Sequence, residues 1–291
     1  MSNFLLIGGS GGLGDFLRSP LVRLGTVDET SRRQQSRGAV FFDAMHGLNG
    51  LDVSRWRVVV YAAGITSLSE CEANPDLSEK VNLRTPIEVA EAVSACGGFF
   101  LYLSSSAANE YREMSVAEAL RAHQRGATGA SAYGLHKYLA EQELLALENA
   151  AILRLAKVAT PQWELPRAWV SRLAAGGRIE AFYDHFLSPL TPKVLSDLVS
   201  VVVQQRLTGL FEASASDQLS YLEAATVLAR GLGGDERRVD PVSALSKLDK
   251  RHVLRRAMLD TSRSETHLGV AMISSGGALQ QYLKTDPQVS T

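Results

Sequence analysis

The sequence contains few cysteines, no excess of either charge and no long apolar run. Only two cysteines, Cys71 and Cys96, occur among its 291 residues, which is too few for a disulfide framework. Neither they nor the six histidines have the spacing of metal ligands, so no metal site is expected. The 30 basic residues nearly balance the 31 acidic ones, which disfavours nucleic acid as a partner.

No part of the chain approaches the roughly 18 consecutive apolar residues that cross a membrane. The N-terminus also has no basic segment followed by a long apolar run, which is the pattern of a secretory leader. We therefore expect a soluble, cytoplasmic protein with reduced cysteines and with no membrane partner.

What the sequence does have is a glycine-rich stretch near its start, Gly8-Gly9-Ser10-Gly11-Gly12-Leu13-Gly14. Four apolar residues, 4–7, precede it and suit a short buried strand. A turn of this kind leads into a helix whose first N–H groups bind phosphate, and glycine lets the backbone approach that phosphate closely. The spacing predicts a dinucleotide site in which Ser10 contacts the pyrophosphate. Simple packing of the strand against the helix is the alternative.

Strands and helices alternate through the first half of the chain. The apolar runs that suit strands lie at residues 4–7, 26–30, 39–42, 56–61, 99–103 and 151–155. This alternation predicts an α/β fold with a Rossmann-like, doubly wound parallel sheet. We expect a dinucleotide-binding domain over residues 1–158, with returns around 193–213. A smaller, mostly C-terminal substrate lobe over 159–291 would be interleaved with it.

Three segments fit this alternation of strands and helices less well. Pro20 interrupts the first helical pattern and is expected to kink or shorten that helix near Arg18. Residues 109–129 show no convincing periodicity, which predicts a long functional loop. The charged tail is expected to be locally helical around residues 249–258.

The end of the second predicted strand bears on the choice of cofactor. Ser31, Arg32 and Arg33 stand where an acidic residue would pair with the ribose 2′-hydroxyl of NAD(H). Arginine there accommodates a 2′-phosphate, so these residues favour NADP(H) over NAD(H), with a solvated basic loop as the alternative. The small residues after the fourth predicted strand, Ala62-Ala63-Gly64, allow close contact with a flat ligand.

Tyr133 and Lys137 stand four residues apart on a predicted helix over 131–148, so their side chains share one face. A phenol with a pKa of about 10 is a weak acid near neutrality, and a neighbouring ammonium draws that pKa down. The serine cluster 104–106 ends the fifth predicted strand and supplies a hydroxyl that can hold a substrate oxygen beside the phenol. These groups predict acid/base chemistry on a carbonyl or hydroxyl.

The motifs described above and several others form one set along the chain. In chain order the set is 8–14, Ala62-Ala63-Gly64-Ile65-Thr66, Cys71-Glu72-Ala73-Asn74-Pro75, Val81-Asn82, Ser104-Ser105-Ser106, Tyr133-Gly134-Leu135-His136-Lys137 and Ile152-Leu153-Arg154. Together they resemble the extended short-chain dehydrogenase/reductase superfamily. Within it they are most similar to the dTDP-4-dehydrorhamnose reductase and sugar-nucleotide epimerase/dehydratase branch. The resemblance covers residues 1 to about 158 and is weak beyond them.

The resemblance implies roles for the matching residues. Tyr133 would be the acid/base, and Lys137 would bind the nicotinamide ribose and lower the pKa of that tyrosine. Ser106 would orient the substrate carbonyl or hydroxyl, with Ser105 as the alternative if the register shifts by one residue. Asn82 would help to hold the architecture of the active site.

The activity that the resemblance implies is NADP-dependent reduction of a keto-sugar nucleotide of the 4-keto-6-deoxy type. Hydride would come from the nicotinamide and a proton from Tyr133, Asp43 would lie near the adenine, and the protein would be a monomer or homodimer. The alternatives are an epimerase or dehydratase that retains NAD, and a non-catalytic NADP-binding regulator. Two segments depart from the family pattern, Ala107-Ala108-Asn109-Glu110-Tyr111 after the serines and Thr160-Pro161-Gln162-Trp163 in the lobe.

Other residues admit two interpretations each. The glycine stretch also fits the GxSxG turn of a hydrolase with Ser10 as nucleophile, but no distinctive Asp or His context follows it. Arg154, after the sixth predicted strand, either contacts a substrate phosphate or forms a structural salt bridge. Trp163 and Trp169 suit the core of the lobe better than a platform for a base or sugar.

Overall fold

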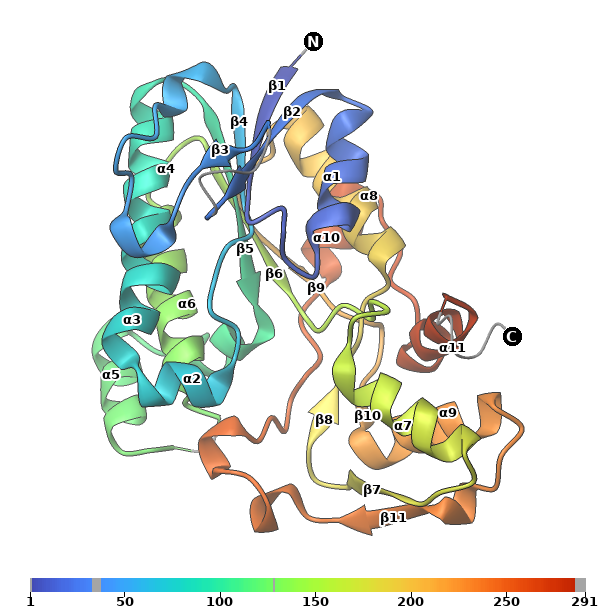
Figure 1. Cartoon of the computed structure of the whole chain (residues 1–291). Coiled ribbons are helices and arrows are strands. Elements are labelled where there is room, and N and C mark those ends of the chain that lie inside the picture. The colour runs from blue at the N-terminus through green and yellow to red at the C-terminus, as the bar shows by residue number, and fades with distance from the viewer. Residues whose placement is uncertain (1, 33–37, 128, 286–291) are drawn as a thin grey trace.

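The computed structural model of the chain describes residues 2–32, 38–127 and 129–285. Its centre is a sheet of seven parallel strands in the order β3-β2-β1-β4-β5-β6-β9 (Figure 1). The strands are β1 (Ser2–Ile7), β2 (Gly25–Ser31), β3 (Val40–Phe41), β4 (Val58–Tyr61), β5 (Phe99–Ser105), β6 (Ala150–Leu155) and β9 (Gly209–Ala213). This architecture confirms the predicted doubly wound, Rossmann-like fold.

Helices cover both faces of the sheet (Figure 1). One face packs against α1 (Gly14–Val22) and α8 (Pro192–Gln205), and the other packs against α4 (Thr85–Ala95) and α6 (Ala132–Leu144). The short helices α2 (Leu68–Ala73) and α3 (Pro75–Glu79) lead into α4. Because side chains on both faces are buried, the central strands appear in the sequence as nearly continuous apolar runs.

The first helix runs through Pro20 and ends at Val22, so the predicted shortening near Arg18 is wrong. Proline removes the backbone donor that would otherwise bond to the carbonyl of Phe16. The hydroxyl of Ser196 on α8 donates to that carbonyl at 2.8 Å. A neighbouring helix therefore replaces the missing donor, and the sequence around Pro20 carries no sign of it.

The lobe below the sheet has its own core. It is built from α7 (Glu164–Ala174), α9 (Tyr221–Gly231), α11 (Ser275–Thr285), the parallel pair β7 (Ile179–Phe182) and β11 (Val239–Val242), and the antiparallel pair β8 (Phe186–Leu187) and β10 (Leu219–Ser220). Trp163 and Trp169 are buried in this core, as predicted. None of the described helices is long and apolar enough to cross a membrane.

Two segments differ from their predictions. Residues 109–129 contain α5 (Val116–Gln124), which begins with a capping box between Ser115 and Glu118. The tail is not helical over 249–258 apart from a single short turn at Lys250–His252, and α10 (Ser262–Leu268) follows instead. No helix continues beyond this turn because the N–H groups of Leu254, Ala257 and Met258 bond to the distant side chains of His185 and Gln218.

Candidate active site

The glycine-rich turn lies between β1 and α1, at the carboxyl edge of the sheet. Strand order reverses between β1 and β4, and ligands of open α/β sheets bind outside such a switch point. Gly11 N donates to the Gly8 carbonyl at 3.0 Å and Gly14 N to the Gly11 carbonyl at 2.9 Å, so the turn is tight. Ser10, Gly11 and Gly12 are exposed, which leaves the turn accessible to a phosphate.

Close backbone contacts explain two of the glycines. Gly8 has a φ of +91°, and a Cβ there would lie 2.6 Å from the nitrogen of Ala63, in the Ala62-Ala63 segment that follows β4. A Cβ on Gly14 would lie 1.5 Å from the carbonyl oxygen of Gly9. Leu13 precedes α1 and its apolar side chain cannot cap the helix, so no side chain of that residue competes with a ligand for the N–H groups that follow Gly14.

The end of β2 lies beside this turn. Gly8 N donates to the hydroxyl of Thr30 at 3.2 Å, and Ser31 and the exposed Arg32 follow directly. Arg33 lies outside the described residues. The structure therefore brings Ser31 and Arg32 to the region where the ribose of a dinucleotide would lie.

Asp43 follows β3, the strand next to β2. Its carboxylate accepts the backbone N–H of Met45 at 3.0 Å and lies 3.6 Å from Nδ1 of His46. These contacts cap a short turn. Among the described residues, no hydrogen bond or ion pair joins Asp43 to the glycine-rich turn, so its predicted place near an adenine rests on position alone.

Asn82 lies in a single π-helical turn, Lys80–Arg84, and is fully buried. Its Oδ1 accepts Ile65 N–H and its Nδ2 donates to the Ile65 carbonyl, both at 3.0 Å. A Cβ on Gly64 would lie 2.8 Å from Asn82 Oδ1 and 3.8 Å from Lys137 Nζ. Asn82 thus fixes the loop after β4 beside the lysine, and π-helical turns are frequent at functional sites.

Lys137 is buried, and its Nζ contacts a backbone carbonyl and an aromatic ring. Nζ donates to the Leu103 carbonyl at 3.0 Å and lies 4.3 Å from the centre of the Tyr102 ring. The Tyr102 hydroxyl in turn donates to the Asn82 carbonyl at 2.8 Å. The end of β5, the π-helical turn and α6 therefore converge on Lys137.

The three serines at the end of β5 have different surroundings. Ser104 is buried, and its hydroxyl has no hydrogen-bond partner within the described part of the chain. Ser105 and Ser106 are half-buried, and the Ser105 hydroxyl accepts Ala107 N–H at 3.2 Å. Of the three, Ser105 is the one whose hydroxyl acts on the Tyr133 phenol and lowers its pKa.

Tyr133 is the second residue of α6 and is 8% exposed, packed against Cys71, Ala107 and Ala132. Its ring centre lies 6.0 Å from Lys137 Nζ. Burial raises the pKa of Tyr133 to about 12, and the Ser105 hydroxyl offsets only part of that rise. Burial also lowers the pKa of Lys137 to about 7.

In the protein without a cofactor, burial opposes the predicted lowering of the Tyr133 pKa by Lys137, which stays a prediction for the cofactor-bound site. The physical reason is that both groups are desolvated, which favours the neutral forms of phenol and amine and removes the charge that would act on the phenol.

The geometry and sequence together match a known family. The family model described as the RmlD substrate binding domain matches residues 2–287. The chain belongs to this family. The RmlD family places it among the extended short-chain dehydrogenase/reductases, which are NAD(P)-dependent oxidoreductases. Among curated proteins, none matches the sequence significantly.

Solved structures share the RmlD-family fold. A dTDP-4-dehydrorhamnose reductase from Clostridium acetobutylicum is similar with a TM-score of 0.79 and 20% identity, covering 97% of this chain and 98% of that one. The Bacillus anthracis enzyme in complex with NADP gives 0.76 and 17%, covering 97% and 99%. The Bordetella bronchiseptica enzyme WbmG, in complex with NAD and UDP, gives 0.73 and 20%, covering 97% and 93%.

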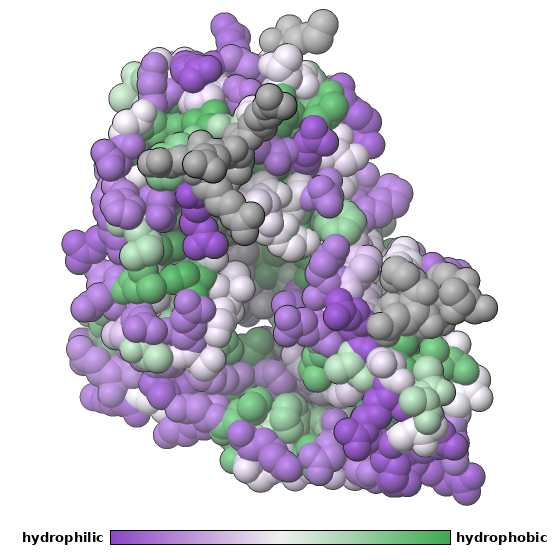
Figure 2. Space-filling view, viewed as in Figure 1, coloured by the Kyte–Doolittle hydropathy of each residue, from purple (hydrophilic) through white to green (hydrophobic). Residues whose placement is uncertain are grey.

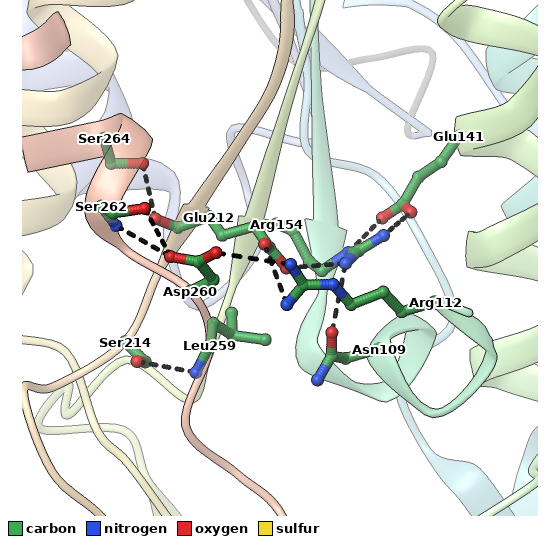
Figure 3. Close-up of polar contacts among 10 residues, drawn as sticks. All are labelled: Asn109, Arg112, Glu141, Arg154, Glu212, Ser214, Leu259, Asp260, Ser262 and Ser264. Atoms are coloured by element: carbon green, nitrogen blue, oxygen red, sulfur yellow. Dashed lines mark hydrogen bonds and ion pairs between the residues drawn. The ribbon is translucent and has the colours of Figure 1, made fainter. Parts of the chain in front are cut away.

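In this RmlD-family chain Arg154 forms a structural salt bridge. It is 2% exposed and lies between two carboxylates (Figure 3). Its Nε donates to Glu141 at 3.0 Å and its Nη1 to Glu212 at 2.7 Å. Of the two interpretations of Arg154, substrate phosphate or salt bridge, the structure supports the second.

The structure also brings forward a residue that the sequence patterns did not single out. Lys157 follows β6, and its Nζ lies 5.9 Å from the ring centre of Trp163 in the lobe. The apolar run at residues 151–155 predicted the end of this strand correctly, but it did not single out the lysine two residues beyond it. Figure 2 shows a hollow between the sheet-bearing part and the lobe, with hydrophobic residues along its lower wall. No group of three or more possible metal ligands occurs among the described residues.

Proposed function

We propose that this protein reduces the carbonyl group of a keto-sugar nucleotide of the 4-keto-6-deoxy type, with NADPH as the hydride donor. The observation that supports this most strongly is the convergence of Tyr133, Lys137 and a strand-end serine beside the glycine-rich turn. This is the set of groups that a carbonyl needs for hydride transfer coupled to proton transfer.

The residues present fit a nicotinamide dinucleotide. The turn from Gly8 to Gly14 is tight and accessible, as a pyrophosphate requires, and Cβ atoms at Gly8 and Gly14 would collide with the backbone. Ala62-Ala63-Gly64 continues this surface toward Lys137 and Asn82. When bound, the nicotinamide supplies the hydride.

The protein's own groups would handle the proton. Tyr133 stays protonated at neutral pH, so it can donate its phenolic proton to the oxygen that gains charge as the carbonyl is reduced. Ser105, or Ser106 one residue further, would hold that oxygen beside the phenol. Lys137, once protonated, would stabilise the phenolate that remains until a solvent proton replaces the one given up.

Arg32 supports the preference for NADP(H). It is exposed directly after β2, where a 2′-phosphate would lie and where an acidic residue would serve NAD(H). Two similar structures hold NADP and NAD respectively, so the fold accepts either cofactor and the local residues decide.

The substrate would lie in the hollow between the sheet and the lobe. Lys157 stands at the carboxyl end of β6, where burial lowers its pKa, and the diphosphate of a bound sugar nucleotide would favour its charged form. The similar WbmG structure contains UDP, the nucleotide portion of one such class of compounds.

The test is incubation of the purified protein with NADPH and a panel of 4-keto-6-deoxy sugar nucleotides, followed by absorbance at the nicotinamide band and by mass spectrometry of the product. Stoichiometric NADPH consumption with a product two hydrogens heavier is the expected result. A product of unchanged mass, formed with tightly retained NAD, would instead identify an epimerase. Binding of NADPH without turnover of any panel member would identify a non-catalytic regulator.

A further inference from the structure

Glu72 connects the helix that carries Tyr133 to the C-terminal part of the chain. It lies in the last turn of α2, and its Oε1 accepts the backbone N–H of Ala132 at 2.7 Å. Ala132 is the first residue of α6 and directly precedes Tyr133. The Glu72 carboxylate therefore accepts an N–H group that has no partner within the helix. The helix dipole also favours a negative charge at this end.

The second oxygen of the same carboxylate binds an arginine from far along the chain. Arg251 Nη1 donates to Glu72 Oε2 at 2.6 Å. Asp249 holds the same guanidinium through Nε at 3.1 Å and Nη2 at 2.6 Å. The side chains of Arg251 and Glu72 are 30% and 15% exposed, so this pair is shielded more than an ordinary surface salt bridge.

The segment that carries Arg251 also contacts both halves of the molecule through its backbone. Gly129 N, in the loop that leads into α6, donates to the Lys250 carbonyl at 3.2 Å. On the lobe side, Leu254 N donates to Nδ1 of His185 at 2.9 Å, and Phe186 N donates to the Leu254 carbonyl at 3.0 Å. Residues 250–254 thus link the lobe strand β8 to the loop before Tyr133.

We infer that Arg251 is a positioning residue that couples the substrate lobe to Tyr133 through Glu72. When the lobe moves, residues 250–254 move with it. Arg251 then shifts the Glu72 carboxylate, which accepts the Ala132 N–H at the start of α6. The phenol then takes its working position when the lobe is in its bound position. The catalytic part of this inference rests on the proposed reductase function, but the structural coupling does not.

The chain contains a matched control for Arg251. Asp235 and Arg237 repeat the local arrangement of Asp249 and Arg251, with a carboxylate that caps a short turn and bonds the arginine two residues later. The Arg237 side chain, however, is 89% exposed. Arg251→Gln removes the link to Glu72, whereas Arg237→Gln removes only the equivalent local bonds.

Amide hydrogen exchange followed by mass spectrometry tests the coupling without any substrate. Arg251→Gln should raise exchange in peptides covering residues 126–134 about tenfold, while Arg237→Gln leaves them unchanged, because loss of one charged hydrogen bond shifts local opening by about that factor. Glu72→Gln keeps an acceptor for Ala132 and should give a smaller rise. Unchanged exchange at 126–134 in Arg251→Gln would overturn the inference.

Kinetics then test the catalytic consequence. Arg251→Gln should lower kcat about tenfold, since small displacements of a reacting group are costly, with the Kd for NADPH unchanged and Arg251→Lys restoring part of the loss. An unaltered kcat in Arg251→Gln would overturn the positioning role. If the native protein turns over no keto-sugar nucleotide, the proposed function fails, and the exchange experiment still decides whether Arg251 is coupled to α6.

Discussion

The Ser78 hydroxyl lies 2.9 Å from Nδ1 of His136, at the end of a hydrogen-bonded chain that begins at Asn82. Asn82 Nδ2 donates to the Ser78 oxygen at 3.1 Å, so the Ser78 proton is free to point at His136. His136 Nδ1 is then an acceptor and the imidazole is neutral. Protonation of Nδ1 would leave the buried Ser78 hydroxyl without an acceptor.

This arrangement predicts loss of stability in acid. Burial lowers the pKa of His136 to about 4. Because the unfolded chain binds that proton already below about 6.5, the free energy of unfolding should fall between pH 6.5 and 4, by up to about 3 kcal/mol from this group. Burial lowers the pKa of His185 to about 4 as well, so it contributes similarly. Urea unfolding at several pH values measures the fall.

A variant of an exposed histidine is the control for this prediction. His136→Gln should remove about half of the pH dependence between 6.5 and 4, whereas His267→Gln, at an exposed position on α10, should leave it intact. An unaltered slope in His136→Gln would contradict the neutral assignment of the buried ring.

Cofactor binding should take up protons. Burial lowers the pKa of Lys137 to about 7, so the side chain is largely neutral at pH 8. The negative charge and hydroxyl acceptors of a bound dinucleotide favour the ammonium form, which raises that pKa. Titration calorimetry at pH 8 in buffers of different ionisation enthalpy should report uptake of up to about one proton per NADPH. Lys137→Met should abolish the uptake, and equal uptake in that variant would disprove its assignment to Lys137.

Removal of Arg154 should destabilise the protein strongly. Arg154→Met leaves the buried carboxylates of Glu141 and Glu212 without their shared partner, which costs about 3 to 5 kcal/mol. Arg178→Met breaks an exposed pair with Asp240 and should cost far less, because solvent screens that pair. Urea unfolding of both variants measures the difference, and similar costs would show that the buried network contributes little.

The proposed preference for NADPH depends on Arg32. Arg32→Ala should weaken NADPH binding about tenfold or more, because hydrogen bonds to a charged phosphate contribute about 1.5 to 3 kcal/mol, and should leave NADH binding nearly unchanged. Arg23→Ala, at another exposed position just after α1, is the matched control. Fluorescence titration with both cofactors measures the effect. Equal weakening of NADPH and NADH by Arg32→Ala would refute a contact with the 2′-phosphate.

Local sequence patterns were sufficient for the fold class and for the elements that carry the candidate site. Continuous apolar runs predicted the central strands, because helices bury both faces of the sheet. The four-residue spacing of Tyr133 and Lys137 needed only a helix. The family pattern named Asn82 and Lys137 as site residues, but it did not show that Asn82 holds the loop after β4 beside the lysine.

The errors occurred where distant residues decide the local structure. Pro20 does not end its helix, because Ser196 donates to the freed carbonyl. The tail around Arg251 reads as charged and helical, yet contacts to Glu72 and to the lobe limit it to one short turn. By contrast, α5 was missed although its capping box was visible locally, since a short helix with few apolar residues gives a weak periodicity.

The proton donor is the central claim, and substitution of Tyr133 tests it most directly. Tyr133→Phe removes only the phenolic hydroxyl, and Tyr138→Phe makes the same change on the same helix at a residue that packs against Tyr111. The rate of NADPH oxidation in a single turnover with the keto-sugar nucleotide substrate should fall about 10² to 10⁴-fold in Tyr133→Phe, with the Kd for NADPH unchanged. Tyr138→Phe should retain most of the rate. A Tyr133→Phe variant that reduces the substrate at the native rate would contradict the account.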